Sequence, residues 1–99
     1  MKVAYLLGSL NRGGTETLVL DVFRKASANG LNIIGIYRKK GGSLEKEFQE
    51  SRVPMIFVPY GKNLFAYCRQ LRKIIQQHNV HILHAQQPLD AFLAWLCLR

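Results

Sequence analysis

The chain has 99 residues, a net charge of +8 at neutral pH, and 48% apolar and 20% charged residues. This size and composition allow one small globular domain with a modest core and exclude a disordered chain. No apolar run approaches the roughly 18 residues of a membrane-spanning helix, and the excess of positive charge admits nucleic acid, an anionic membrane or a phosphorylated ligand as a partner.

Short apolar runs alternate with longer helical patterns, which is typical of repeated βα units around a parallel sheet. We expect the first strand at 2–7, because its nearly continuous apolar run suits a strand that is covered on both faces. A helix is expected from Thr15 to Ala28. Its apolar residues at helical spacing predict a buried face made of Leu18, Val19, Val22, Phe23 and Ala26.

The second unit begins with an isoleucine-rich strand at 32–37. The basic segment 38–42, Arg-Lys-Lys-Gly-Gly, follows it and is expected to form an exposed turn. Ser43 is a suitable N-cap for a short helix that reaches residue 51, with acidic residues in the first turn where the helix dipole favours them. A third strand is expected at 55–58, because the prolines that bracket it are tolerated at strand ends.

The last two units have the same pattern. Asn63 is expected to cap a helix whose buried stripe would be Leu64, Tyr67, Cys68, Leu71, Ile74 and Ile75. A fourth strand is expected at 80–85, followed by a helix from about Leu89 that is apolar on nearly every side and therefore predicted to be buried all round. This helix stops at Arg99 without a C-cap or a following strand, so we expect a truncated domain.

Right-handed crossovers between these units predict a single α/β domain over 1–99. It would be a Rossmann-like three-layer fold with about four parallel strands in the order 3-2-1-4. The strand at 80–85 would be an unprotected edge beside an apolar helix, which predicts self-association.

The two cysteines, Cys68 and Cys97, lie far apart and match neither a redox motif nor a zinc-ligand spacing. Both occur in apolar helical segments, where a free thiol packs as a small apolar side chain. These features favour free thiols in a reduced, cytoplasmic protein. No metal site is predicted, because the usual ligand spacings are absent from the sequence.

The strongest chemical signal is the glycine-rich segment 8–14, Gly-Ser-Leu-Asn-Arg-Gly-Gly, between the first strand and the first helix. Doubly wound folds bind phosphates at this position. The segment is not a dinucleotide fingerprint, and Gly14 stands where a phosphate loop requires lysine, which argues against an ATPase or GTPase. Gly13 and Gly14 would let a ligand approach the backbone, or they would serve only the tight turn. The helix dipole would stabilise Glu16 in either case.

A first strand ending in Gly8, followed by a loop that closes with Gly13, Gly14 and Glu16 at a helix start, resembles the opening of the family 4 glycosyltransferases. The segment 82–88, Ile-Leu-His-Ala-Gln-Gln-Pro, resembles that family's second landmark. The resemblance implies a GT-B enzyme, in which two Rossmann-like domains face a cleft. The N-terminal domain mostly contacts the acceptor, and the C-terminal domain holds the nucleotide-sugar. This chain would be part of the N-terminal domain.

Carried over to this sequence, the resemblance implies a binding site for substrate or donor. Its residues would be Gly13, Gly14, Thr15, Glu16, His84 and Gln86. Many relatives have a second histidine where Gln86 stands. The resemblance implies no catalytic residue within 1–99 and no cofactor, the nucleotide-sugar being a substrate. The expected function is the N-terminal portion of a retaining glycosyltransferase that moves a sugar from a nucleotide-sugar to an acceptor and is inactive alone.

Two alternatives stay open. One is a noncatalytic Rossmann-like module that binds a ligand or nucleotide. The other is a basic interaction domain for nucleic acid or membrane, formed by 38–40 together with Arg69, Arg72 and Lys73. No RNA-binding aromatic motif accompanies these residues, which disfavours nucleic acid. Peripheral contact at the inner face of the membrane is expected, because a basic helix face attracts anionic lipid and the acceptors of the resembling family are often lipid-linked.

Overall fold

The computed structural model describes residues 2–10, 14–59, 64–85 and 88–98. Within these residues, four strands alternate with four helices along the chain. Their bounds are β1 (Val3–Ser9), α1 (Gly14–Ala28), β2 (Ile33–Lys39), α2 (Glu45–Glu50), β3 (Met55–Phe57), α3 (Leu64–Gln77), β4 (Ile82–Ala85) and α4 (Pro88–Leu98).

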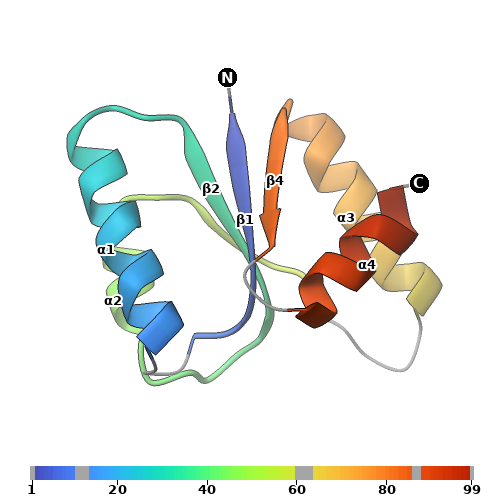
Figure 1. The fold of residues 1–99 in the computed structure, drawn as a ribbon, viewed down its shortest axis with the longest axis horizontal. Coiled ribbons are helices and arrows are strands. Elements are labelled where there is room, and N and C mark those ends of the chain that lie inside the picture. Colours follow the sequence, from blue (N-terminus) through green and yellow to red (C-terminus); the bar gives the residue numbers. More distant parts are fainter. Residues whose placement is uncertain (1, 11–13, 60–63, 86–87, 99) are drawn as a thin grey trace.

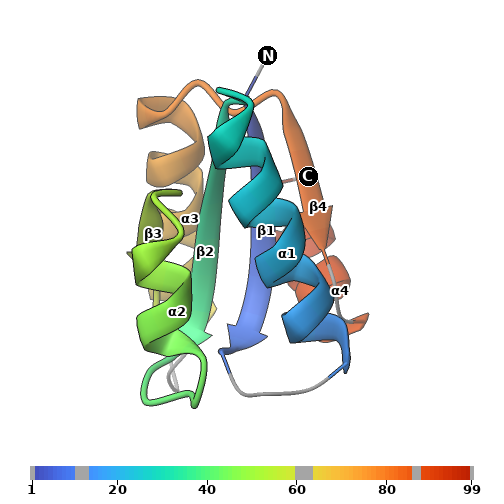
Figure 2. The ribbon, with the colours of Figure 1, turned by 90° about the vertical axis from the view of Figure 1, so that its left-hand side faces the viewer.

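The four strands pair in parallel in the order β3-β2-β1-β4, as the sequence predicts. Helices α1 and α2 cover one face of the sheet, and α3 and α4 cover the other, so the three-layer Rossmann-like fold is confirmed (Figure 1). The carboxyl ends of β1 and β2 and the starts of α1 and α2 lie at the same end of the molecule, the lower end in Figure 2. We call this end the carboxyl edge.

Alternating residues of the central strands divide the core into two apolar clusters, one on each face of the sheet. Ala4, Leu6, Ile34 and Ile36 belong to the cluster under α3 and α4. Leu7 and its neighbours face α1 and α2, where the aromatic side chains gather. Both faces of β1 and β2 are therefore covered, which explains why these strands read as continuous apolar runs.

Helix α1 turns a different face to the core than its sequence predicts. Val19, Phe23 and Ala26 are buried as expected, but Leu18 is 65% exposed and Val22 is 37% exposed. The side chain of Phe23 lies edge-on to Phe48 of α2, with 5.6 Å between the ring centroids. This contact turns α1 toward α2. Leu18 and Val22, which the sequence predicts for the core, therefore face solvent.

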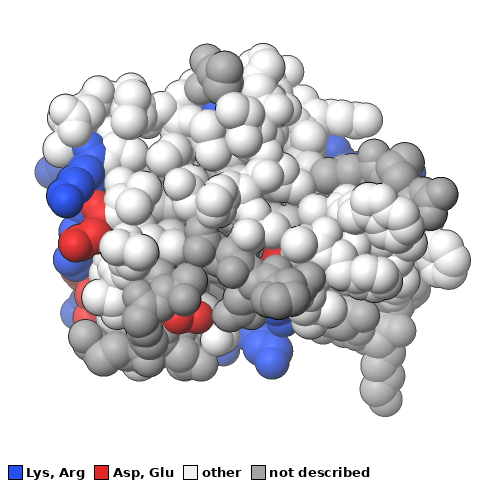
Figure 3. Space-filling view, viewed as in Figure 1, with Lys and Arg blue, Asp and Glu red and all other residues white. Residues whose placement is uncertain are grey.

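The prediction that α4 is buried all round is wrong. Leu93 and Cys97 are buried, but the outer face exposes Leu89, Phe92 and Trp95 to 43%, 54% and 58%. Helix α4 belongs to an outer layer, and only one stripe of an outer helix reaches the sheet. The side of the molecule over α4 is largely free of charged side chains (Figure 3). The self-association expected from this apolar helix stays a prediction.

The prediction of free thiols is also wrong. Cys68 of α3 and Cys97 of α4 form a disulfide, with 4.9 Å between their Cα atoms. They lie 29 residues apart in the sequence, and the fold makes them neighbours because α3 and α4 pack side by side on one face of the sheet. The cytoplasmic location loses the support of free thiols and stays a prediction. None of the described helices is long and apolar enough to cross a membrane.

Two local expectations need correction near the carboxyl edge. Ser43 is not the N-cap of α2, because Leu44 takes that position and makes no side-chain capping bond. The Leu44 N–H instead donates to the Leu10 carbonyl oxygen at 2.6 Å, which ties the turn before α2 to the end of β1. Strands β1 and β2 also run two residues further than predicted, because they continue to pair as far as Ser9 and Lys39. Asn63 lies outside the described residues.

Candidate functional site at the carboxyl edge

Strand order places the candidate site at the carboxyl edge between β1 and β4. These two strands are neighbours in the sheet, but the helices that follow them, α1 and α4, lie on opposite faces (Figure 1). In open α/β sheets, ligands bind outside the carboxyl ends of the strands at such a switch point. The starts of α1 and α4 and the ends of the central strands therefore define where the predicted residues can meet a ligand.

The start of α1 brings part of the glycine-rich segment to this position. Gly14 is the first residue of the helix, and Thr15 and Glu16 follow in its first turn. The first N–H groups of a helix lack partners within the helix, and the helix dipole makes this end positive. These groups suit a phosphate or a sugar hydroxyl. Gly13 lies outside the described residues, and the binding role of all four stays a prediction.

His84 approaches from β4 on the same face of the sheet as α1. Its ring lies against Tyr5 of β1, the residue with which it pairs in the sheet, and their ring centroids are 4.7 Å apart. Tyr5 also contacts Phe23 of α1, with 5.3 Å between ring centroids. His84 is exposed, so its imidazole is accessible to a ligand at the switch point. Gln86 lies outside the described residues.

Arg38 is not in an exposed basic turn, as the sequence predicts, but at the buried end of β2. Ile34, Ile36 and Arg38 alternate along this strand and therefore share the face toward α3 and α4. Only 7% of the Arg38 side chain is exposed, and its Nε donates to Oδ1 of Asp90 at 2.9 Å. The sequence does not reveal that Arg38 is buried, because Arg38 stands in a run of basic residues and β2 continues two residues beyond its predicted end, through Lys39.

Asp90 is the residue of this region that sequence analysis missed. It is the acidic residue in the first turn of α4 and is 1% exposed. A carboxylate in an otherwise apolar helix is a usable signal, because a buried charge is rare unless it is paired. Within the described residues, the second oxygen of Asp90, Oδ2, has no hydrogen-bond partner. The pair joins the end of β2 to the start of α4, at the carboxyl edge.

The segment between β2 and α2 is held in place by several contacts. Glu45 accepts hydrogen bonds from the Gly41 N–H at 2.7 Å and from the Tyr37 hydroxyl at 3.4 Å. Burial raises the pKa of Tyr37 above its ordinary value, and the negative charge of Glu45 adds to this shift. The Nζ of Lys40 lies 4.8 Å from the centroid of the Phe57 ring. The exposed amines of this segment are thus fixed beside the carboxyl edge.

Gly42 brings this segment against the end of β1. A Cβ atom at Gly42 would overlap the backbone of Leu10, so any larger residue would push the two segments apart. Leu10 directly precedes the part of the glycine-rich loop that lies outside the described residues. The backbone packing at Gly42 therefore holds the basic segment against the residue that follows β1.

Taken together, the described residues of the carboxyl edge suit binding of an anionic or hydroxyl-rich ligand. They supply backbone donors at α1 and exposed amines from Lys39 and Lys40, and the imidazole of His84 lies on the same face, near the end of β4 and beside Tyr5. Among the described residues, no group of three metal-ligating side chains occurs.

Comparison with known proteins identifies the family. The model of Glycosyltransferase Family 4 matches residues 12–99, which is most of the chain. The chain belongs to glycosyltransferase family 4. This match contains both landmarks on which the resemblance rests, the end of the glycine-rich loop and the segment around His84.

The fold of this family 4 chain is similar to that of a solved enzyme. The crystal structure of a glycosyltransferase from Rickettsia africae ESF-5 matches with a TM-score of 0.72 and 23% sequence identity. The match covers 98% of this chain and 27% of the solved one, so the chain spans about a quarter of that protein's length. None of the curated proteins matches the chain significantly.

Proposed function

We propose that this family 4 chain forms the acceptor-side, N-terminal portion of a retaining glycosyltransferase with GT-B architecture. The whole enzyme would transfer a sugar from a nucleotide-sugar to an acceptor. One observation carries the proposal. In a chain that matches family 4, the start of α1 and the histidine near the end of β4 lie on the same face of the sheet.

Each part of the carboxyl edge has a role in this proposal. Gly13 and Gly14 allow close approach of a phosphate or sugar ring to the backbone, and the first N–H groups of α1 donate to it. Thr15 and Glu16 would bind sugar hydroxyls, and so would His84 with Gln86 from the β4 side. The Arg38–Asp90 pair does not touch the ligand, but it fixes the start of α4 against β2.

The chain is proposed to bind substrate without turning it over. The residues assigned here bind and orient, and none of them is given a catalytic role. The resemblance instead implies that the catalytic groups and the donor clamp lie in other parts of a family 4 enzyme. Release of nucleotide from a nucleotide-sugar by residues 1–99 alone would contradict this division of roles.

The acceptor is not identified, so the binding role is tested with UDP-glucose and GDP-mannose as probes, because both supply the phosphates and sugar hydroxyls that the site is proposed to contact. They are titrated into the protein, and heat or amide shifts are measured. We expect His84→Ala to weaken binding about three- to tenfold, which corresponds to the loss of one hydrogen bond. His78 follows α3 and lies outside the proposed site. His78→Ala is therefore the matched control and should leave binding unchanged. Equal effects of the two substitutions would refute the site.

A further inference from the structure

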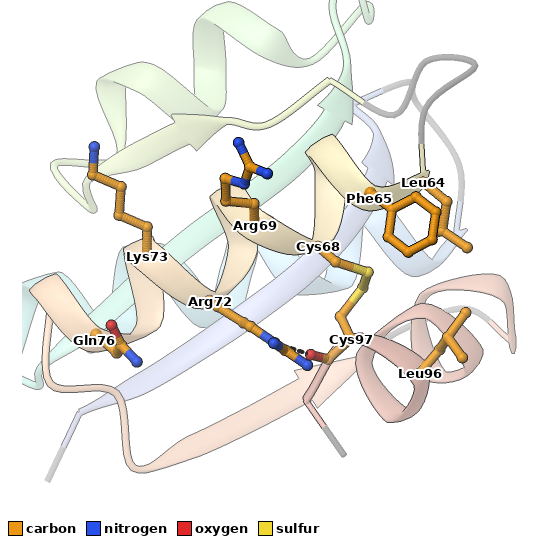
Figure 4. A pocket seen from close by; sticks show the side chains of 9 residues that line it. All are labelled: Leu64, Phe65, Cys68, Arg69, Arg72, Lys73, Gln76, Leu96 and Cys97. Atoms are coloured by element: carbon orange, nitrogen blue, oxygen red, sulfur yellow. Dashed lines mark hydrogen bonds between the residues drawn. A yellow bond between two sulfur atoms is a disulfide. The ribbon is translucent and has the colours of Figure 1, made fainter.

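A second concave site lies between α3 and α4, away from the carboxyl edge (Figure 4). This groove has a volume of about 740 Å³, within the usual range for small-molecule sites. Its lining comes from both helices and consists of Leu64, Phe65, Cys68, Arg69, Arg72, Lys73, Gln76, Leu96 and Cys97. None of these residues belongs to the site proposed above.

The groove is apolar at one end and cationic at the other. Leu64, Phe65 and Leu96 lie at one end together with the disulfide. Arg69 and Lys73 lie further along α3, and Arg72 reaches from α3 toward Cys97 (Figure 4). Phe65 is 82% exposed, which is a large apolar exposure for an aromatic side chain. A ligand that fills the groove would therefore have an apolar part and a polar part at opposite ends.

The charge of the polar end is not balanced by acidic residues. Arg72 and Lys73 follow Arg69 by three and four residues, so each of them is a neighbour of Arg69 on the surface of α3. Neither α3 nor the lining of the groove contains an aspartate or glutamate. The Nε of Arg72 donates to the carbonyl oxygen of Cys97, which uses one of the five N–H donors of this side chain. The remaining donors suit an anionic group.

We propose that this groove binds a single-chain anionic amphiphile as a monomer. The carboxylate or phosphate head would contact Arg72, with Arg69 and Lys73 adding positive charge nearby, and the alkyl chain would lie along Phe65, the disulfide and Leu96. A bilayer surface fits less well, because the site is hollowed between two helices and its apolar and cationic parts lie end to end. A neutral lipid would leave the cations without a partner.

Calorimetric titration of the protein with decanoate tests the proposal. The decanoate concentration is kept in the range where decanoate is monomeric. We expect decanoate to bind at least tenfold more tightly than either acetate or 1-decanol, because only decanoate satisfies both ends of the groove. Equal binding of acetate would indicate a simple anion site and overturn the proposal. Equal binding of 1-decanol would show that the cations play no part.

Matched double variants separate the groove from general charge effects. Arg69→Gln with Lys73→Gln should weaken decanoate binding about tenfold. Arg24→Gln with Lys25→Gln removes the same charge from exposed positions of α1 on the other face of the sheet and should have no effect. All four side chains are exposed, so circular dichroism should show a folded protein in each case. Equal losses in both variants would contradict the proposal.

A third substitution tests the apolar end. Phe65→Ser should reduce the preference for decanoate over hexanoate while leaving the folded state intact, because Phe65 is exposed. An unchanged preference would mean that the alkyl chain of decanoate does not lie along Phe65. Phosphatidylglycerol vesicles provide the last comparison. A protein that binds these vesicles but not monomeric decanoate would have a membrane-binding surface, and the monomer site would be refuted.

Discussion

The two faces of the sheet hold their helices by different means. On one face, α1 and α2 are held by aromatic packing, in which Phe23 lies edge-on to both Tyr5 and Phe48. On the other face, α4 is also tied at both ends, by the ion pair of Asp90 and by the disulfide of Cys97. The comparison shows that a regular apolar pattern predicts most of the first arrangement, with Leu18 and Val22 as exceptions, whereas the second depends on contacts between residues distant in sequence.

Removing the aromatic packing should have the largest effect. Phe23 is fully buried, so Phe23→Ala should lower the free energy of unfolding by about 3 to 5 kcal/mol through lost contacts and a cavity. Urea denaturation measures this change. The control on the same helix is Leu18→Ala, at a position 65% exposed, which should cost less than about 0.5 kcal/mol. A similar loss of stability in both variants would mean that Leu18 is buried, as the sequence predicts, and not exposed.

Breaking the ion pair tests the first tie of α4. Arg38→Met leaves the buried carboxylate of Asp90 without its counter-charge, which should cost about 3 to 5 kcal/mol of unfolding free energy. The double variant with Asp90→Leu should recover most of this loss, because an apolar pair can replace a buried ion pair. Urea denaturation of both proteins checks this. A double variant as unstable as the single one would mean that the pair is not the cause.

Opening the disulfide tests the second tie. Replacing Cys68 and Cys97 by serine should lower the free energy of unfolding by about 3.5 kcal/mol, the chain-entropy value for a loop of this length. Adding dithiothreitol to the unchanged protein should lower its free energy of unfolding by the same amount. The stability of the double serine variant should not change when dithiothreitol is added. Equal stability of the reduced and oxidised protein would show that packing alone holds both faces.

The sequence predicts the sheet well, because apolar strands and handed crossovers are local or general rules. It also places the starts of α1 and α4 and the histidine of β4 on the right elements. It fails at Arg38 and Asp90, which are 52 residues apart and acquire their roles only as a pair. Arg38 resembles its basic neighbours in the sequence, and only strand alternation beyond the predicted end of β2 buries it.

The same limit applies to the cysteines and to the outer face of α4. Spacing rules detect ligands and redox motifs that are close in sequence, whereas Cys68 and Cys97 meet only after β4 has placed α4 beside α3. An apolar composition predicted full burial for α4, although the number of neighbours around a helix decides how much of it is covered. Gly13 and Gln86 lie outside the described residues, so their predicted places are not tested.

The disulfide also has a mechanical consequence. If the two ends of the protein are pulled apart, the segment between Cys68 and Cys97 cannot extend, because the bond carries the load across α3 and α4. The fully stretched chain would be shorter by about 100 Å than the reduced chain, since an extended residue spans roughly 3.3 to 3.6 Å. The most C-terminal strand and helix would then be shielded from a pulling force that reaches every preceding strand.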